Sequence, residues 1–267
     1  MTATELFKEG RLAEAILAQN SEVKRQPADQ DARYLLFMLL CFAGELERAE
    51  KQLDVLGRQD EKAQMGGLLY RSLLGAELER RKVFEQGARP VLPPDPPGYL
   101  EERLRGLESL RAGDLEGLEK SIDRAVDESP ILSGKLNGRD FEGLRDYDDL
   151  LGTVVEIFAG GRYLWMPLDR LRRLEIGGPA TALDTLWHPA KLEDADGEEA
   201  DIHLPVLYAG SHAYENEAVQ LGRVTEWVGR GEYYTGAGQH IFLVSHEGEV
   251  SEEPVLGIRK LELGGTG

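Results

Sequence analysis

One pattern of glycine, leucine and alanine occurs twice near the start of the chain and constrains its fold more than any other feature. The pattern G-x-L-x-x-A begins at Gly10 and again at Gly44, which lies 34 residues further on. Glycine permits the tight turn between two antiparallel helices, and the small alanine lets the second helix approach the first closely. The spacing therefore predicts antiparallel helix pairs that recur every 34 residues.

This period is the one found in tetratricopeptide helix pairs, which bury their apolar faces by stacking on neighbouring pairs. A looser third copy begins at Gly113, and Pro130 follows where its second helix would end. Residues 60–86 read as further helix, whereas the proline-rich segment 90–98 reads as a loop. We therefore expect a tetratricopeptide-like helical repeat domain over residues 1–130, with an irregular array that the rest of the chain caps.

Beyond the third copy, glycine, tryptophan and tyrosine become more frequent, and short apolar runs alternate with turn residues. Such runs are typical of strands, and Gly160-Gly161 between two of them reads as a hairpin turn. The candidate strands are 153–158, 162–166, 202–208, 241–245 and 255–263. One or two helices are expected, at 169–174 and 180–187. The sequence thus predicts a second domain over 138–267, a strand-rich antiparallel sheet or partly open barrel, and a two-domain fold of the α + (α+β) class.

The chain is strongly acidic, with 31 Lys and Arg against 49 Asp and Glu and a formal net charge of -18. Nucleic-acid binding needs a basic surface that displaces counterions from phosphates, so this charge disfavours a nucleic-acid partner. The longest apolar run falls well short of the roughly 20 residues that cross a bilayer, and the first residues do not resemble a secretory signal. The single cysteine, Cys41, excludes an internal disulfide. We expect a cytoplasmic protein that binds neither nucleic acid nor membrane.

Residues that could carry chemistry are present, but they form no recognisable catalytic pattern. Asp146, Asp148 and Asp149 could bind a cation or serve acid–base chemistry, although turn formation and capping ahead of a strand explain them as well. The five histidines include no H-E-x-x-H pair, and the sequence has no G-x-S-x-G elbow or cysteine set for zinc. We expect no catalytic residue, metal or cofactor. A hydrolase that uses residues 146–149 with a histidine, and a structural subunit of a larger assembly, stay as alternatives.

The strand-rich part resembles the ImpE family (SciE-type, TagJ). Residues 146–156 match the signature D-x-D-D-x-L-G-x-x-x-E. Further matching segments are Gly161-x-Tyr163-x-Trp165-x-Pro167, Leu186-Trp187-x-Pro189-Ala190, Leu204-Pro205-x-Leu207-Tyr208-x-x-Ser211, Leu221-Gly222-Arg223-x-Thr225-x-Trp227 and Ile258-Arg259. The resemblance implies a non-enzymatic adaptor of bacterial type VI secretion. Such an adaptor binds a helix of the small subunit of the contractile sheath, and also the AAA+ ATPase that recycles contracted sheath.

A partner helix is expected to dock in the concave surface of the stacked repeats, with anchors on one face of the helix. If Gly44 forms the turn within its repeat, then Tyr34, Met38, Cys41 and Phe42 lie near the concave side of the preceding helix. Methionine adapts its shape, and tyrosine offers an apolar body with a polar tip. Each of the four could equally be an ordinary core residue, and the apolar neighbours of Cys41 are typical of packing.

Overall fold

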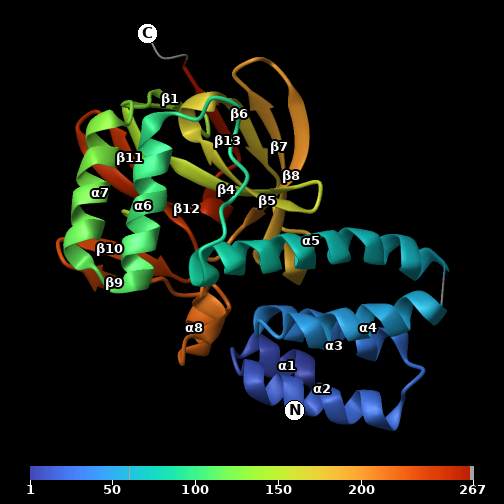
Figure 1. Ribbon diagram of the computed structural model, residues 1–267. Coiled ribbons are helices and arrows are strands. Elements are labelled where there is room, and N and C mark those ends of the chain that lie inside the picture. Colours follow the sequence, from blue (N-terminus) through green and yellow to red (C-terminus); the bar gives the residue numbers. More distant parts are fainter. Residues whose placement is uncertain (60, 265–267) are drawn as a thin grey trace.

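The structure is a computed structural model that describes residues 1–59 and 61–264 (Figure 1). Helices come first along the chain, and strands fill the remainder. The helices of the first part are α1 Ala3–Lys8, α2 Leu12–Arg25, α3 Gln30–Phe42, α4 Leu46–Gln59, α5 Glu61–Gln86, α6 Gly98–Ala112 and α7 Leu115–Glu128. A helical N-terminal part and an antiparallel, strand-rich C-terminal part agree with the predicted two-domain arrangement.

The repeated G-x-L-x-x-A pattern forms the turns of two helix pairs, α1–α2 and α3–α4. Gly10 and Gly44 adopt positive φ angles of 86° and 70°, which L side chains rarely tolerate. The leucine and alanine of each copy are buried, and Ala15 and Ala49 are fully inaccessible to solvent where the paired helices meet. The pattern therefore marks helix-pair turns, as predicted, while assignment of the pairs to the tetratricopeptide class stays a prediction.

The long helix α5 links the two parts of the molecule. Its first half packs on α4, and its second half packs on strands β4 (Val154–Ala159) and β5 (Arg162–Pro167). The pair α6–α7 turns at Gly113, which has a φ of 71°. This pair lies against the strand-rich part, away from α1–α4 (Figure 1). The third copy of the pattern thus forms a helix pair, but that pair does not stack on the first two.

The C-terminal part contains antiparallel sheets of eight, three and two strands, ordered β2-β1-β13-β6-β7-β8-β4-β5, β12-β11-β3 and β10-β9. The remaining strands are β1 Gly134–Leu136, β2 Arg139–Phe141, β3 Gly143–Asp146, β6 Leu171–Ile176, β7 Trp187–Asp194, β8 Glu199–Pro205, β9 Glu226–Arg230, β10 Tyr233–Ala237, β11 Ile241–His246, β12 Glu249–Pro254 and β13 Lys260–Leu263. Gly160 and Gly161 form the β4–β5 hairpin turn with φ angles of 56° and 78°, which confirms that prediction. The boundaries 1–130 and 138–267 stay a prediction; the observed helices end at Glu128, and β1 begins at Gly134.

Both helices predicted in this part, at 169–174 and 180–187, are wrong. The segment 169–174 is mostly strand, because the buried Leu174 and Ile176 alternate with half-buried neighbours and β6 pairs with β13 and β7 on its two sides. The segment 180–187 holds a short 3-10 turn, Ala182–Thr185, and then enters β7. The predicted strand 255–263 is also divided, by a 3-10 turn at Val255–Gly257 ahead of β13.

Strand β4 separates two apolar cores. Val154 and Phe158 belong to the core shared with the helices, whereas Val155 and Ile157 belong to a core enclosed by the sheets. Successive side chains of a strand point to opposite faces, so Glu156 faces the helices. A carboxylate in the middle of a strand that is buried on both faces needs a polar partner. Glu156 is therefore a candidate member of a functional site.

Candidate functional site

Glu156 is one member of a buried chain of charged side chains. Arg80, from α5, donates two hydrogen bonds to Glu156, from Nε to Oε1 and from Nη2 to Oε2, each 2.7 Å long. The Nε2 atom of His240 lies 3.1 Å from Glu156 Oε2, in a geometry too bent for a well-formed hydrogen bond. The Nδ1 atom of His240 lies 2.7 Å from Oδ2 of Asp146. Two carboxylates, one guanidinium and one imidazole thus run from helix α5 to the end of β3, and all four are buried.

We call Arg80, Glu156, His240 and Asp146 the buried charge cluster, and its electrostatics favour the ionised forms of Glu156 and His240. Burial alone would raise the pKa of Glu156, but Arg80 and His240 outweigh burial and hold that pKa well below its usual range. Burial alone would lower the pKa of His240, but Asp146 and Glu156 raise it to about 9. The imidazole therefore carries a positive charge at neutral pH, and both it and Arg80 face the carboxylate of Glu156.

Each aspartate of the D-x-D-D segment accepts at least one hydrogen bond from a backbone amide. Oδ1 of Asp146 accepts hydrogen bonds from Asp148 N at 2.8 Å and from the Tyr208 hydroxyl at 2.6 Å. Asp148 accepts from Leu150 N at 2.9 Å and from Gly236 N at 2.8 Å, and burial raises its pKa to about 7. Asp149 accepts from the backbone of β10 through Tyr234 N, at 2.7 Å. The turn-forming interpretation of these aspartates is therefore confirmed, and they also attach β10 to the loop after β3.

The arrangement resembles a carboxylate–histidine pair, but it has no room for a substrate. A general acid or base has to come within hydrogen-bond reach of the group it serves. The cavity bordered by Asp146, Glu156 and His240 measures about 10 Å³, which is about the space of one water molecule. In the described part of the chain, no three His, Cys, Asp or Glu side chains are grouped so that they could hold a metal ion. The geometry supports a role in joining helix α5 to the sheets.

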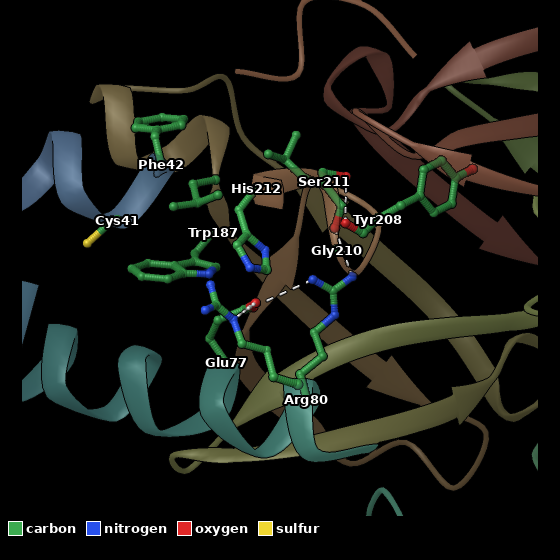
Figure 2. Close-up of a pocket in the computed structure, with 12 residues that line it drawn as sticks. Cys41, Phe42, Glu77, Arg80, Trp187, Tyr208, Gly210, Ser211 and His212 are labelled. Carbon is green, nitrogen blue, oxygen red and sulfur yellow. Dashed lines mark hydrogen bonds and ion pairs between the residues drawn. The ribbon is translucent and has the colours of Figure 1, made fainter. Parts of the chain in front are cut away.

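A second contact between the two parts lies beside this cluster, where α3 and α5 meet the segment Gly210–His212 (Figure 2). The Gly44 turn packs on the His212 ring so tightly that a Cβ at residue 44 would collide with it. Arg81 donates a hydrogen bond of 2.8 Å to the Gly44 carbonyl, and burial lowers the pKa of His212 to about 4. Only about 20 Å³ is left open here. The turn of the second helix pair is therefore a docking point for the strand-rich part.

The turn of the first helix pair is held in a similar way. Arg223 donates hydrogen bonds to the carbonyls of Phe7 at 2.7 Å and Lys8 at 3.0 Å, at the end of α1. Glu217, in the short helix α8 (Glu217–Gln220), accepts hydrogen bonds from Leu12 N at 2.9 Å and Ala13 N at 2.8 Å, at the start of α2. Residues 210–223 thus contact both copies of the glycine turn, which fixes the array of α1–α4 relative to the sheets.

The four residues predicted to bind a partner do not share one surface. Tyr34 is 36% exposed, and its hydroxyl lies 3.0 Å from that of Tyr70 on α5. Met38, Cys41 and Phe42 are buried in the core shared by the helices. For these three the structure shows the packing expected of ordinary core residues, because α3 is covered on most of its circumference. Partner binding through the four stays a prediction, with Tyr34 as the accessible member.

Several residues of the buried charge cluster were not singled out from the sequence. Arg80 lies in the charged run Glu79-Arg80-Arg81-Lys82, which reads as solvent-facing. His240 is separated from Glu156 by more than 80 residues, so no local pattern connects them. Glu156 did carry a signal, because it is a single charge within the apolar run Val-Val-Glu-Ile-Phe. In such a run an isolated carboxylate indicates a buried partner.

Comparison with known proteins places the chain in a family. The family model described as ImpE protein matches residues 138–261. The "Type VI secretion system accessory component TagJ" of Pseudomonas aeruginosa is 32% identical over 262 residues, which is 98% of this chain and 91% of that protein. The crystal structure of protein VPA1032 from Vibrio parahaemolyticus has a TM-score of 0.89 at 24% identity, over 98% of this chain and 97% of that one, and supports the fold. The chain therefore belongs to the ImpE family.

Proposed function

We propose that this protein is a non-enzymatic, cytoplasmic adaptor of the type VI secretion system. In this proposal it binds a helix of the small subunit of the contractile sheath and links that subunit to the AAA+ ATPase that recycles contracted sheath. The observation that carries the proposal is the similarity to TagJ along nearly the full length of both chains. Among the described helices, none combines the length and the apolar character needed to cross a bilayer.

The geometry of the charged site supports an adaptor better than a hydrolase. The structure brings Asp146 and His240 together, but beside them it leaves a cavity of about 10 Å³ only. The exposed surface of the helical array is better suited to a partner. Tyr34 and Tyr70 meet at their hydroxyls on this surface, whereas the exposed Leu69, directly before Tyr70, borders a hollow that α5 shares with the strand-rich part. An amphipathic helix buries apolar anchors spaced over two turns, which such a surface can receive.

The proposal is tested by fluorescence anisotropy with a labelled peptide that spans the helix of the sheath small subunit. A contact that must form and release is expected to have a Kd on the order of micromolar, or about -8 kcal/mol. Replacing Tyr34 by alanine is expected to weaken binding by about 1–3 kcal/mol, because a few anchors carry most of the affinity of an interface. Met38→Ala tests the buried neighbour, with a thermal melt to separate binding from stability.

The matched control is Tyr234→Ala, since Tyr234 is also an exposed tyrosine but lies on β10. It is expected to bind as wild type. If Tyr34→Ala and Met38→Ala stay folded and bind as wild type, this surface is not the docking site. Co-purification with the ATPase tests the second link. A fixed stoichiometric ratio to the other subunits in purified assemblies would favour a structural subunit over an adaptor.

A further inference from the structure

A groove on the opposite side of the molecule from the helical array has features of a ligand site. It lies on the three-stranded sheet, beside the end of α7 and the segment that leads to β1, and it encloses about 330 Å³. We call it the α7 groove. Its walls include Val126 of α7, Ile131 of the connecting segment, Leu243 of β11 and Val250 of β12. The volume is at the lower end of the range typical of small-ligand sites.

The outer wall of the α7 groove is apolar and exposed. Val126, Ile131 and Val250 are 49%, 86% and 65% exposed, and all three border the same depression. Apolar residues scattered singly over a surface need no explanation, but apolar residues gathered around a concave site indicate binding. The floor is open because Gly143 has no side chain above Ser245.

A buried arginine borders the same groove. Arg103, from α6, is only 2% exposed. Its Nη1 donates hydrogen bonds to the carbonyls of Asp149 at 3.0 Å and Leu150 at 3.2 Å, while Nη2 makes only a long contact of 3.5 Å with the Ser129 hydroxyl. Within the described residues, Nε has no hydrogen-bond partner and no carboxylate comes within 4.0 Å of the guanidinium.

This charge is incompletely compensated. Burial and the nearby Arg145 lower the pKa of Arg103 to about 10, because they outweigh the attraction of Tyr99, Asp148 and Asp149, so the positive charge is held at a cost. Gly152 has a φ of 52°, and a Cβ there would collide with the guanidinium, so the backbone is shaped to admit Arg103. A purely structural role, in which Arg103 clamps the loop after β3, accounts for Nη1. It leaves Nε without a partner among the described residues, and Nη2 with only the long Ser129 contact.

We propose that the α7 groove binds the carboxyl terminus of a peptide whose last residue is apolar. The terminal carboxylate takes the place of the long Ser129 contact at Arg103, because guanidinium and carboxylate form strong charge-assisted hydrogen bonds. The last side chain packs on Leu243 and Val250. Glu252 pairs across the sheet with Leu243 at the rim, so an acidic residue further upstream is disfavoured and a basic one is favoured.

The test uses four fluorescein-labelled hexapeptides, Gly-Ser-Lys-Ala-Val-X, in which X is Leu, Ile, Val or Phe. Each is made with a free carboxyl terminus and as the carboxyl amide, and binding to the full-length protein is followed by anisotropy. At least one free acid is expected to bind, and its amide is expected to bind at least tenfold more weakly. Val250→Glu and Ile131→Glu are expected to weaken binding of that acid at least fivefold, because they place a negative charge at the groove. Arg103→Lys keeps the charge but removes the forked donors, so it is expected to weaken binding of that acid at least threefold.

The control variant is Leu17→Glu, which changes an equally exposed leucine outside the groove and is expected to bind as wild type. The result for Arg103→Lys is used only if thermal melting shows that this variant is folded. Val250→Glu and Ile131→Glu test the proposal independently of it. Equal binding of acids and amides, or no binding of any acid up to 1 mM, overturns the proposal. Octanoate is tested as the last ligand. If octanoate binds, the same substitutions weaken its binding, and none of the peptides binds, then the groove takes a free apolar acid and the peptide proposal is wrong.

Discussion

Helix α5 and the pair α6–α7 both pack against the strand-rich part, but they do so with different chemistry. At α5 the centre of the contact is the buried charge cluster, in which Arg80 meets Glu156. At α6–α7 the contact is apolar around Gly106, where an added Cβ would come within 3.3 Å of Leu150. The buried charge of this contact, Arg103, donates hydrogen bonds to backbone carbonyls. The first contact depends on opposite charges that have to stay paired, whereas the second depends on shape, buried area and the hydrogen bonds of one arginine to the backbone.

This difference indicates what each contact contributes. A buried ion pair adds little net stability over an apolar contact of the same size, because desolvation of the charges offsets their attraction. It is strict about geometry, however, because two forked groups meet in few orientations. The charge cluster therefore fixes the direction of α5, and with it the position of α1–α4. The α6–α7 contact supplies apolar burial, and its buried Arg103 bonds to backbone carbonyls in place of a forked carboxylate.

The largest expected effect is at the charge cluster. Glu156→Gln removes the carboxylate that both buried cations face, and among the described residues it leaves Arg80 with only the 3.5 Å ion pair to Glu77, so we expect a loss of about 3–5 kcal/mol in the free energy of unfolding. Urea denaturation followed by tryptophan fluorescence measures it. Glu116→Gln is the control, since it breaks an exposed helical pair with Lys120 and should cost less than 1 kcal/mol. Similar losses of stability in Glu156→Gln and Glu116→Gln would show that the buried charge cluster matters no more to stability than an exposed ion pair.

The second prediction concerns pH, and it separates the two contacts directly. The pKa of His240 rises from 6.5 to about 9 on folding, so its stabilising contribution is complete below pH 6.5 and is lost as the pH rises through about 9. The groups that face its ring are Asp146, Glu156 and Tyr208. We expect the wild-type free energy of unfolding to fall by up to about 3 kcal/mol over this window, from the 1.36 kcal/mol per pKa unit of linkage.

The comparison variants sharpen that measurement. His240→Gln should flatten the alkaline slope. Leu150→Ala, at the α6–α7 contact, should lower the whole curve by about 2–5 kcal/mol, as expected for a truncated core leucine, and leave its shape unchanged. An alkaline slope that persists in His240→Gln would show that another group is responsible.

The parts of the fold that the sequence predicts are those with a local signal. The glycine turns at Gly10 and Gly44 and the hairpin at Gly160 need positive φ angles, and glycine reports such angles directly. Strands β4, β5 and β11 are apolar runs bounded by turn residues, and they were also predicted. Each of these features is set by residues within a few positions of one another.

The parts that were missed depend on partners far away in the chain. Strand β12 has the sequence Glu-Val-Ser-Glu-Glu-Pro, and it is a strand because β11 pairs with it. The segment of β6 has apolar residues three apart, as in a helix, until its neighbours β7 and β13 impose extended geometry. Arg80 and His240 carried no local signal, because Arg80 bonds to Glu156, 76 residues away, and His240 bonds to Asp146, 94 residues away.

The third prediction uses the three glycine turns as a matched series. Gly44, Gly10 and Gly113 all have positive φ, so replacement by alanine should cost each about 1 kcal/mol in backbone strain. Gly44→Ala adds a collision with His212 and should cost about 2–3 kcal/mol in total, whereas a Cβ at Gly113 meets nothing within 4 Å. Gly10→Ala should fall between them, because its Cβ would approach Arg223 to 3.1 Å. Thermal melts give the order of the three losses in stability.

His212→Ala in the Gly44→Ala background should recover the part of the loss that the collision causes. Equal losses of stability in all three glycine variants would show that docking of the turns on the strand-rich part contributes nothing.

The smallest expected effect is at Glu217, which caps a helix from the far end of the chain. Helix α2 begins after Arg11, whose side chain makes no capping hydrogen bond, and Glu217 accepts the N–H groups of Leu12 and Ala13 in its place. A carboxylate at a helix N-terminus satisfies free N–H donors and interacts favourably with the helix dipole. Glu217→Ala should therefore cost about 1 kcal/mol, the usual value of an N-cap side chain. Hydrogen exchange should show faster exchange at the Leu12 and Ala13 amides, with Glu215→Ala as the exposed neighbouring control. Unchanged exchange at those two amides would mean that α1–α2 holds its position through the Arg223 contacts alone, and that the array is tied to the sheets at fewer points than the geometry indicates.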